Sequence, residues 1–120
     1  MNIYGKYNMK FSWKEVVLKH LSENVKVYEY CDKFDNLPID AAIVELNGQF
    51  GPKINKSFTE LFFVISGKLI ILEDNNEHAL IARDVYIMQP GIKHSLHGNN
   101  CTLFVSCAPQ FNPINVDFVS

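Results

Sequence analysis

Residues 59–73 read TELFFVISGKLIILE, two apolar runs that Ser66-Gly67 separates. Aromatic and β-branched side chains are frequent in both runs, Leu61–Ile65 and Leu69–Leu72, which favours strands with a turn between them. Neither run alternates with polar residues, so no face of these strands is expected to meet solvent. One face should point into a barrel, and the other should be covered by a second sheet, an arm or a partner subunit.

Short β-rich segments flank this stretch on both sides. Turn residues separate them, among them Asp74-Asn75-Asn76, Pro90-Gly91 and Gly98-Asn99-Asn100. The regular spacing predicts an all-β sandwich or barrel, and the short connections predict mainly antiparallel pairing. The segments expected to be strands are 25–30, 41–46, 59–66, 68–73, 78–82, 84–88 and 102–106.

The segment before residue 25 has a different pattern. Ser12 and Glu15 have the spacing of a capping box, which predicts a short helix over 13–21. The alternative is an irregular arm, because Val16-Val17 also suits a strand. The predicted organisation is an arm with a short helix over 1–24, a barrel over 25–108, and a tail over 109–120 that packs on the barrel or a partner.

The composition is that of one globular domain. The chain has 120 residues, a formal net charge of -2 and no basic stripe, so nucleic acid and membranes are not expected partners. The longest apolar run, Leu61–Ile65, is too short to span a bilayer, and residues 1–10 lack the apolar segment of a secretory signal. Cys31, Cys101 and Cys107 form no C-x-x-C pair, which predicts buried free thiols and a cytoplasmic protein.

Two segments resemble the sequence motifs of the cupin superfamily. Residues 60–67, ELFFVISG, are similar to the end of the first motif, where a glutamate, six residues and a glycine follow one another. Residues 83–94, RDVYIMQPGIKH, are similar to the second motif, where a strand leads to a proline-glycine turn and a histidine. The matching residues of the second motif are Asp84, Pro90, Gly91 and His94.

The resemblance implies a double-stranded β-helix, or jelly-roll barrel, with a pocket at its mouth. Cupins commonly dimerise, so a homodimer is expected. Two positions depart from the second motif. Arg83 replaces its glycine, which suggests that this turn needs no positive φ, and Gln89 replaces a proline and is expected to put an amide at the barrel mouth.

The usual metal ligands of cupins are incomplete here. Metal-binding members place two histidines, one residue apart, before the motif glutamate, and these bind a transition metal together with the glutamate and the motif histidine. Residues 51–59 contain no histidine: depending on the gap, the two positions hold Lys53 and Asn55, or Ile54 and Lys56. Two protein ligands rarely hold a metal tightly, so no cofactor is predicted. The alternative is Fe, Mn, Zn or Ni bound by His94 and Glu60.

The polar residues at the predicted mouth favour a site for a small polar or anionic molecule, such as a sugar or a small carboxylate. A lysine beside a carboxylate stabilises the charged form of both groups. The alternative for each lysine is a solvent-exposed position on a loop. The predicted ligand-binding residues are Lys53, Asn55, Lys56, Glu60, Gln89 and His94.

Two other functions are compatible with the sequence. The first is an enzyme of the isomerase, epimerase or metal-dependent oxygenase type, acting on a small sugar-like or acidic substrate. His94 would then be the general acid or base, assisted by Glu60 or Tyr86. The second is an interaction protein with an exposed sheet face, which a closed or fully apolar barrel mouth would favour.

Overall fold

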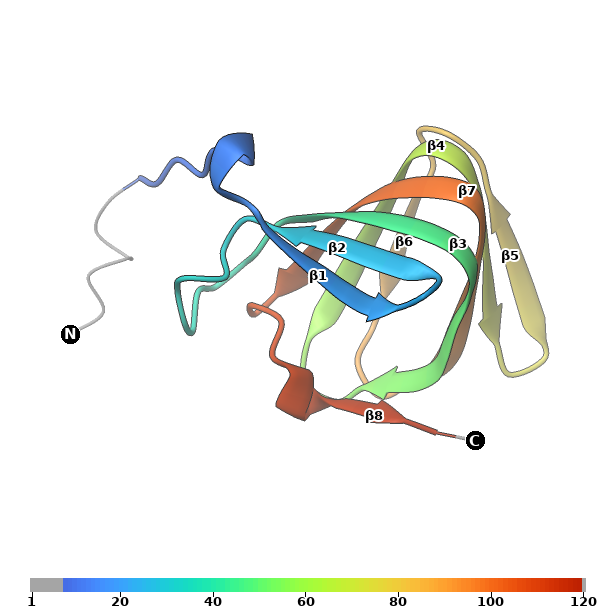
Figure 1. The fold of residues 1–120 in the computed structure, drawn as a ribbon. Helices are drawn as coiled ribbons and strands as arrows, with labels where there is room; N and C mark the ends of the chain where they lie inside the picture. The colour runs from blue at the N-terminus through green and yellow to red at the C-terminus, as the bar shows by residue number, and fades with distance from the viewer. Residues whose placement is uncertain (1–7, 120) are drawn as a thin grey trace.

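The computed structural model of the chain describes residues 8–119 and shows an all-β fold (Figure 1). Two short 3₁₀ helices, η2 and η3, are its only helical elements in the described range. Their bounds are Trp13–Glu15 and Pro113–Asn115. The strands are β1 Val17–Ser22, β2 Val25–Glu29, β3 Ala42–Asn55, β4 Thr59–Glu73, β5 Asn76–Leu80, β6 Val85–Met88, β7 Lys93–Ala108 and β8 Val116–Phe118.

All pairings between these strands are antiparallel. The order in the sheet is β1-β2-β3-β7-β4-β5, with β6 on β4 and β8 on β3. Figure 1 shows β3, β4 and β7 bending along their length, so that the sheet curls around an interior without closing. The all-β prediction is thereby confirmed. Because β3, β4 and β7 bend, the two halves of each of these strands lie on different sides of the interior.

The turn predicted at Ser66-Gly67 does not end a strand, so this prediction is wrong. It is an irregularity inside β4, where the register with β7 shifts on both sides of Ser66. Gly67 has a φ of 78°, and a Cβ there would lie 2.1 Å from the carbonyl oxygen of Asn100, so the bend requires glycine. The turn predicted at Gly98-Asn99-Asn100 likewise does not end a strand, because these residues lie within β7.

The helix predicted over 13–21 is also wrong. Ser12 does cap η2, accepting a hydrogen bond from the Lys14 amide at 3.2 Å, but only one turn forms. The chain then enters β1, which pairs with β2. The β-branched Val16-Val17 pair favours the strand, and the adjacent β2 supplies hydrogen-bond partners that an isolated helical turn lacks.

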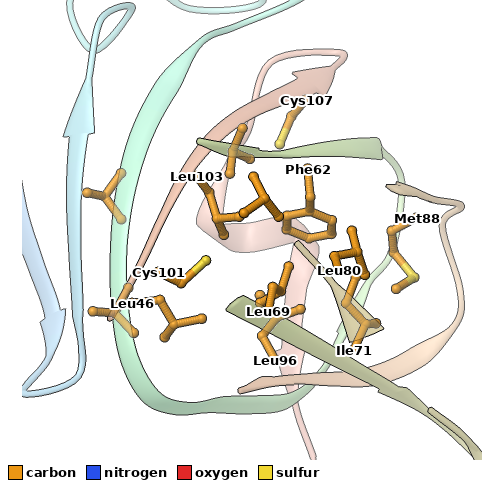
Figure 2. Close-up of a cluster of buried hydrophobic side chains, with 14 of the residues drawn as sticks. Leu46, Phe62, Leu69, Ile71, Leu80, Met88, Leu96, Cys101, Leu103 and Cys107 are labelled. Atoms are coloured by element: carbon orange, nitrogen blue, oxygen red, sulfur yellow. The ribbon is translucent and has the colours of Figure 1, made fainter. Parts of the chain in front are cut away.

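The core fills the interior of the curled sheet. Figure 2 shows its side chains converging from β3 to β7, with Phe62, Leu69 and Leu103 at most 1% exposed. Each such side chain stabilises the fold by about 1.5–3 kcal/mol through burial. The three cysteines are free and buried, as the sequence predicted.

The tail lies against the barrel. Asp40 accepts hydrogen bonds from the amides of Cys107 and Phe111, both at 2.7 Å, which fixes where the tail leaves β7. The Phe111 ring then packs on Phe58 at 5.6 Å, and β8 pairs with the end of β3. Phe118 thus lies opposite Lys53 in the register.

The outer face of the sheet is apolar where β6 meets β4. Val85 pairs with Phe63 and Ile87 pairs with Leu61, and the two β6 side chains are 52% and 46% exposed. Within residues 8–119, no element covers this apolar face, although the sequence predicted that a second sheet, an arm or a partner subunit would. No helix in this range is long and apolar enough to cross a membrane.

Candidate functional site in the barrel

The end of β3 and the start of β4 place three polar side chains on the inner face of the barrel. Lys53, Asn55 and Glu60 are 4%, 0% and 6% exposed. Because strand residues alternate between faces, this register turns Lys56 outward. Lys56 is exposed, and its ammonium lies 3.5 Å from Asp117. Of the two alignments that the sequence left open, the structure therefore has Lys53 and Asn55 inside.

Glu60 is held by hydrogen bonds to both carboxylate oxygens. The Asn55 side-chain amide donates to Oε1 at 3.0 Å, and the Cys107 thiol donates to Oε2 at 3.7 Å. Burial and the nearby Glu60 charge raise the pKa of the Cys107 thiol, so it remains a protonated donor. The carboxylate is thus fixed in orientation on the inner wall.

Lys53 approaches this carboxylate without a hydrogen bond to it. Its Nζ lies 3.9 Å from Glu60 Oε1 and 4.7 Å from the centre of the Phe50 ring. Within residues 8–119, no acceptor lies at hydrogen-bond distance from this ammonium. Lys53 lines a cavity, so its ammonium can donate to water or to a ligand there.

His94 lies next to Lys53 on the adjacent strand. It is 1% exposed and stands in register between Lys53 on β3 and Glu73 on β4. Burial, together with the Lys53 charge, lowers the His94 pKa, so the ring is neutral at pH 7. Nδ1 lies 2.9 Å from the carbonyl oxygen of Ile92, and the neutral ring donates from there.

Two buried acceptors beside Lys53 are unused. His94 Nε2 and Asn55 Oδ1 have no hydrogen-bond partner among the described residues. Each such atom costs about 1–3 kcal/mol relative to a satisfied one. This part of the inner wall therefore stabilises the fold less than it would if both atoms were hydrogen-bonded.

A cavity of about 280 Å³ opens on this wall, near the lower limit of about 300–1,000 Å³ that is common for ligand sites. Lys53 and Glu60 are its buried charged residues. Lys19 and Glu29, which also line it, are more exposed and pair with each other at 2.9 Å. Apolar wall residues include Val27, Val44, Phe50, Val105, Phe111 and Phe118.

The other predicted site residues lie apart from this cavity. Gln89 is exposed, with its side chain 3.5 Å from the Thr59 hydroxyl. Tyr86 donates a hydrogen bond to Glu73, and burial with this bond raises its pKa to about 12. His78 lies in β5, with its ring centroid 5.1 Å from that of Tyr86. His94 and Asn55 stand next to Lys53 but do not line the cavity.

Comparison with solved structures identifies the architecture. A histidine-to-glutamine variant of Streptomyces PAC13 with uridine has a TM-score of 0.82 and 16% identity, covering 95% of this chain and 92% of that one. KdgF from Halomonas sp. has a TM-score of 0.70 and 11% identity, covering 87% and 97%. A sugar phosphate isomerase from a cupin superfamily, from Silicibacter pomeroyi, has a TM-score of 0.68 and 14% identity, covering 85% and 76%.

The chain has the cupin fold. At these identities the likeness concerns the fold alone. No protein-family model matches the sequence, and no curated protein matches it.

The inner wall of this barrel does not suit the transition metal that the resemblance to cupins implied. Of the usual ligands, Glu60 and His94 alone are present, and both oxygens of Glu60 already accept hydrogen bonds. The Lys53 ammonium, 3.9 Å from that carboxylate, would repel a cation. In residues 8–119, no three His, Cys, Asp or Glu side chains are grouped so as to hold a metal. The absence of a cofactor itself remains a prediction.

Sequence reasoning did not identify several cavity residues. Neither Phe50 nor Phe111 lies in a recognisable site motif, and Cys107 was predicted only to be a buried free thiol. All three belong to the hydrophobic core or pack against it, and they also line the cavity, where Cys107 hydrogen-bonds Glu60. The tail brings Phe111 and Phe118 to the cavity, and no sequence motif marks that packing.

Proposed function

We propose that this protein binds a small polar molecule in the barrel cavity, beside Lys53 and Glu60, without a tightly held metal. The observation that carries the proposal is the buried Lys53 ammonium, which borders a cavity of about 280 Å³ and has no hydrogen-bond acceptor within residues 8–119. A ligand oxygen there would satisfy donors that the described residues leave unused.

The structural neighbours are compatible with this proposal. Pac13 is described as a nucleoside dehydratase, and it has been seen with uridine. Another neighbour is a sugar phosphate isomerase. These are small polar substrates, in line with the sugar-like compound or small carboxylate that the sequence suggested.

Blocking the cavity tests the proposal. Ala42 lines the cavity, so Ala42→Phe should fill it and abolish ligand-induced amide shifts in NMR titrations with uridine, glucuronate and a sugar phosphate. Ala79 is exposed on β5, and Ala79→Phe is the matched control that should leave binding unchanged. The proposal fails if none of the probes shifts cavity resonances, or if the Ala42→Phe protein binds as well as the control.

An enzyme is the second candidate, and one observation favours it. His94 is neutral and has a free Nε2 lone pair beside Lys53, which is the state of a general base. A substrate atom would have to reach past Lys53, because His94 does not line the cavity. If His94→Ala left a detected activity unchanged, this role would be excluded.

We also propose a homodimer through the outer face of β4 and β6. The exposed Val85 and Ile87 lie beside the half-buried Phe63 and Leu61, which makes a contiguous apolar surface. The interaction-protein hypothesis loses its main support, because the cavity is open to Lys53 and Glu60 and is not fully apolar.

A further inference from the structure

We infer that the ligand is an uncharged, flat ring compound that carries a hydrogen-bond acceptor and a donor side by side, as a lactam or imide edge does. The inference rests on the proposed function and narrows its ligand class. It differs from the sugar or carboxylate that the sequence suggested, and it follows from the charge, the hydrogen-bond capacity and the walls of the cavity.

The charges of the inner wall are already balanced. Lys53 carries a positive charge, Glu60 a negative one, and His94 is neutral. An anionic ligand on Lys53 would bring a second negative charge close to Glu60, in a site where both side chains are less than a tenth exposed. Burying such an unbalanced charge is costly, so a neutral ligand fits better.

Lys53 and Glu60 offer a ligand one donor group beside one acceptor group. An ammonium only donates, and a carboxylate only accepts. Glu60 receives two bonds, from Asn55 and Cys107, which leaves part of its roughly four acceptor positions free. Since Lys53 Nζ and Glu60 Oε1 are 3.9 Å apart, adjacent carbonyl and N–H groups of one ring edge could meet both.

The walls disfavour a polyhydroxylated ligand. Phe50, Phe111 and Phe118 border the cavity, and the Phe50 and Phe118 rings have centroids 5.7 Å apart. Lys19, which also lines the cavity, is already paired with Glu29 and Asp32. Hydroxyl groups facing the valines and phenylalanines of this wall would lack partners, whereas an aromatic face would pack on them.

Four probes test the ligand class by isothermal titration and amide NMR of the wild-type protein. They are 2-pyridone, N-methyl-2-pyridone, benzoate and glucuronate. We expect 2-pyridone to bind most tightly, and N-methylation to weaken binding about tenfold or more, because it removes the donor to Glu60 while the ring and carbonyl stay. Benzoate has a similar size but two acceptors and a negative charge, and it should bind more weakly than 2-pyridone.

Variants then separate charge from shape. Glu60→Gln removes the negative charge, so it should reverse the preference from 2-pyridone to benzoate. Lys53→Met should weaken 2-pyridone about tenfold or more, and Lys56→Met, on the exposed neighbouring lysine, should change nothing. The wild-type probe series does not depend on how these variants fold.

Three results would overturn the inference. If benzoate or glucuronate binds the cavity more tightly than 2-pyridone, the ligand class is wrong while the proposed function stands. If none of the four probes shifts resonances of cavity residues, the ligand class is wrong, and the proposed function fails as well only if uridine and the sugar phosphate also give no shift. Equal binding of 2-pyridone and its N-methyl derivative would exclude the donor contact to Glu60.

Discussion

Lys53 Nζ lies 3.9 Å from Glu60 Oε1, and the two side chains are 4% and 6% exposed. Removing one partner of such a buried pair leaves an uncompensated charge, whereas removing both does not. We therefore expect Lys53→Met to lower the free energy of unfolding by about 3 kcal/mol, and the double variant Lys53→Met, Glu60→Gln to recover part of it. Urea denaturation of the four proteins in this cycle measures the coupling. Additive losses would mean that the pair does not interact.

The pH dependence of stability should report His94. Burial lowers its folded pKa below the ordinary value of 6.5, so the unfolded chain binds more protons between these two values. The stabilising contribution is complete above pH 6.5 and is lost as the pH falls towards the folded pKa, by up to about 1.4 kcal/mol per pH unit. Denaturation midpoints between pH 5 and 7 provide the measurement.

Matched variants of His94 and His97 test whether His94 is the group that causes this pH dependence. His94→Gln should flatten the slope below pH 6.5, since no proton has to be excluded from that position. His97 is exposed three residues further along β7, and His97→Gln should leave the slope as it is. An unchanged slope in the His94 variant would assign the pH dependence to other groups.

Arg83 is strained, contrary to the sequence-based expectation. Its φ is 78°, while its amide donates to the Val64 carbonyl oxygen at 2.8 Å. Since the left-handed region costs a non-glycine residue about 1–2 kcal/mol, Arg83→Gly should stabilise the protein by about 1 kcal/mol. Arg83→Ala is the control, because alanine keeps the Cβ and the strain. Equal stabilisation by both variants in urea would point to loss of the arginine side chain instead.

The fold was predictable from Glu60–Gly67 and Asp84–His94, because these motifs combine strand propensity with turn chemistry. The extent of the strands was not predictable. Gly67 marks a bend that keeps pairing with β7, and sequence alone does not distinguish this from a hairpin turn. At 13–21, local capping favoured a helix and tertiary pairing with β2 determined a strand.

The site was predictable in composition but only partly in geometry. Lys53, Asn55, Glu60 and His94 do come together, yet a one-residue uncertainty in register left Lys56 as an equal candidate. Tyr86 was predicted to assist His94, and it donates to Glu73, which lies opposite His94 in the strand register. That contact depends on the curvature of the whole sheet, which no local pattern encodes.

If the protein forms a homodimer through the outer face of β4 and β6, a charge introduced on this face should prevent dimerisation. Val85 is 52% exposed on the apolar face, and Val85→Lys would bury an unpaired ammonium in the interface. Light scattering after size exclusion should give twice 13.7 kDa for the wild type and 13.7 kDa for the variant. Ile114 is 73% exposed away from β6, and Ile114→Lys should remain dimeric. A monomeric wild type at micromolar concentration would contradict the dimer.

Replacing Lys53 and Asn55 by histidine should create a metal site. Both side chains point to the inner face beside Glu60 and His94, so the double variant would present three imidazoles and one carboxylate, the set that cupins use for transition metals. It would also remove the ammonium that repels a cation. We expect about one Ni²⁺ or Zn²⁺ per chain after dialysis, by elemental analysis.

The control for that experiment uses the same two substitutions one residue further along. Ile54→His with Lys56→His adds two histidines to the same stretch, but Lys56 is exposed and turned away from Glu60. This variant should hold much less metal, because its imidazoles cannot converge with Glu60 and His94. Similar metal content in both double variants would show that the register of Lys53 and Asn55 on the inner wall is not what determines binding. Stoichiometric metal in the wild-type protein would show that Lys53 does not exclude a cation, and it would overturn the metal-free site proposed for this barrel.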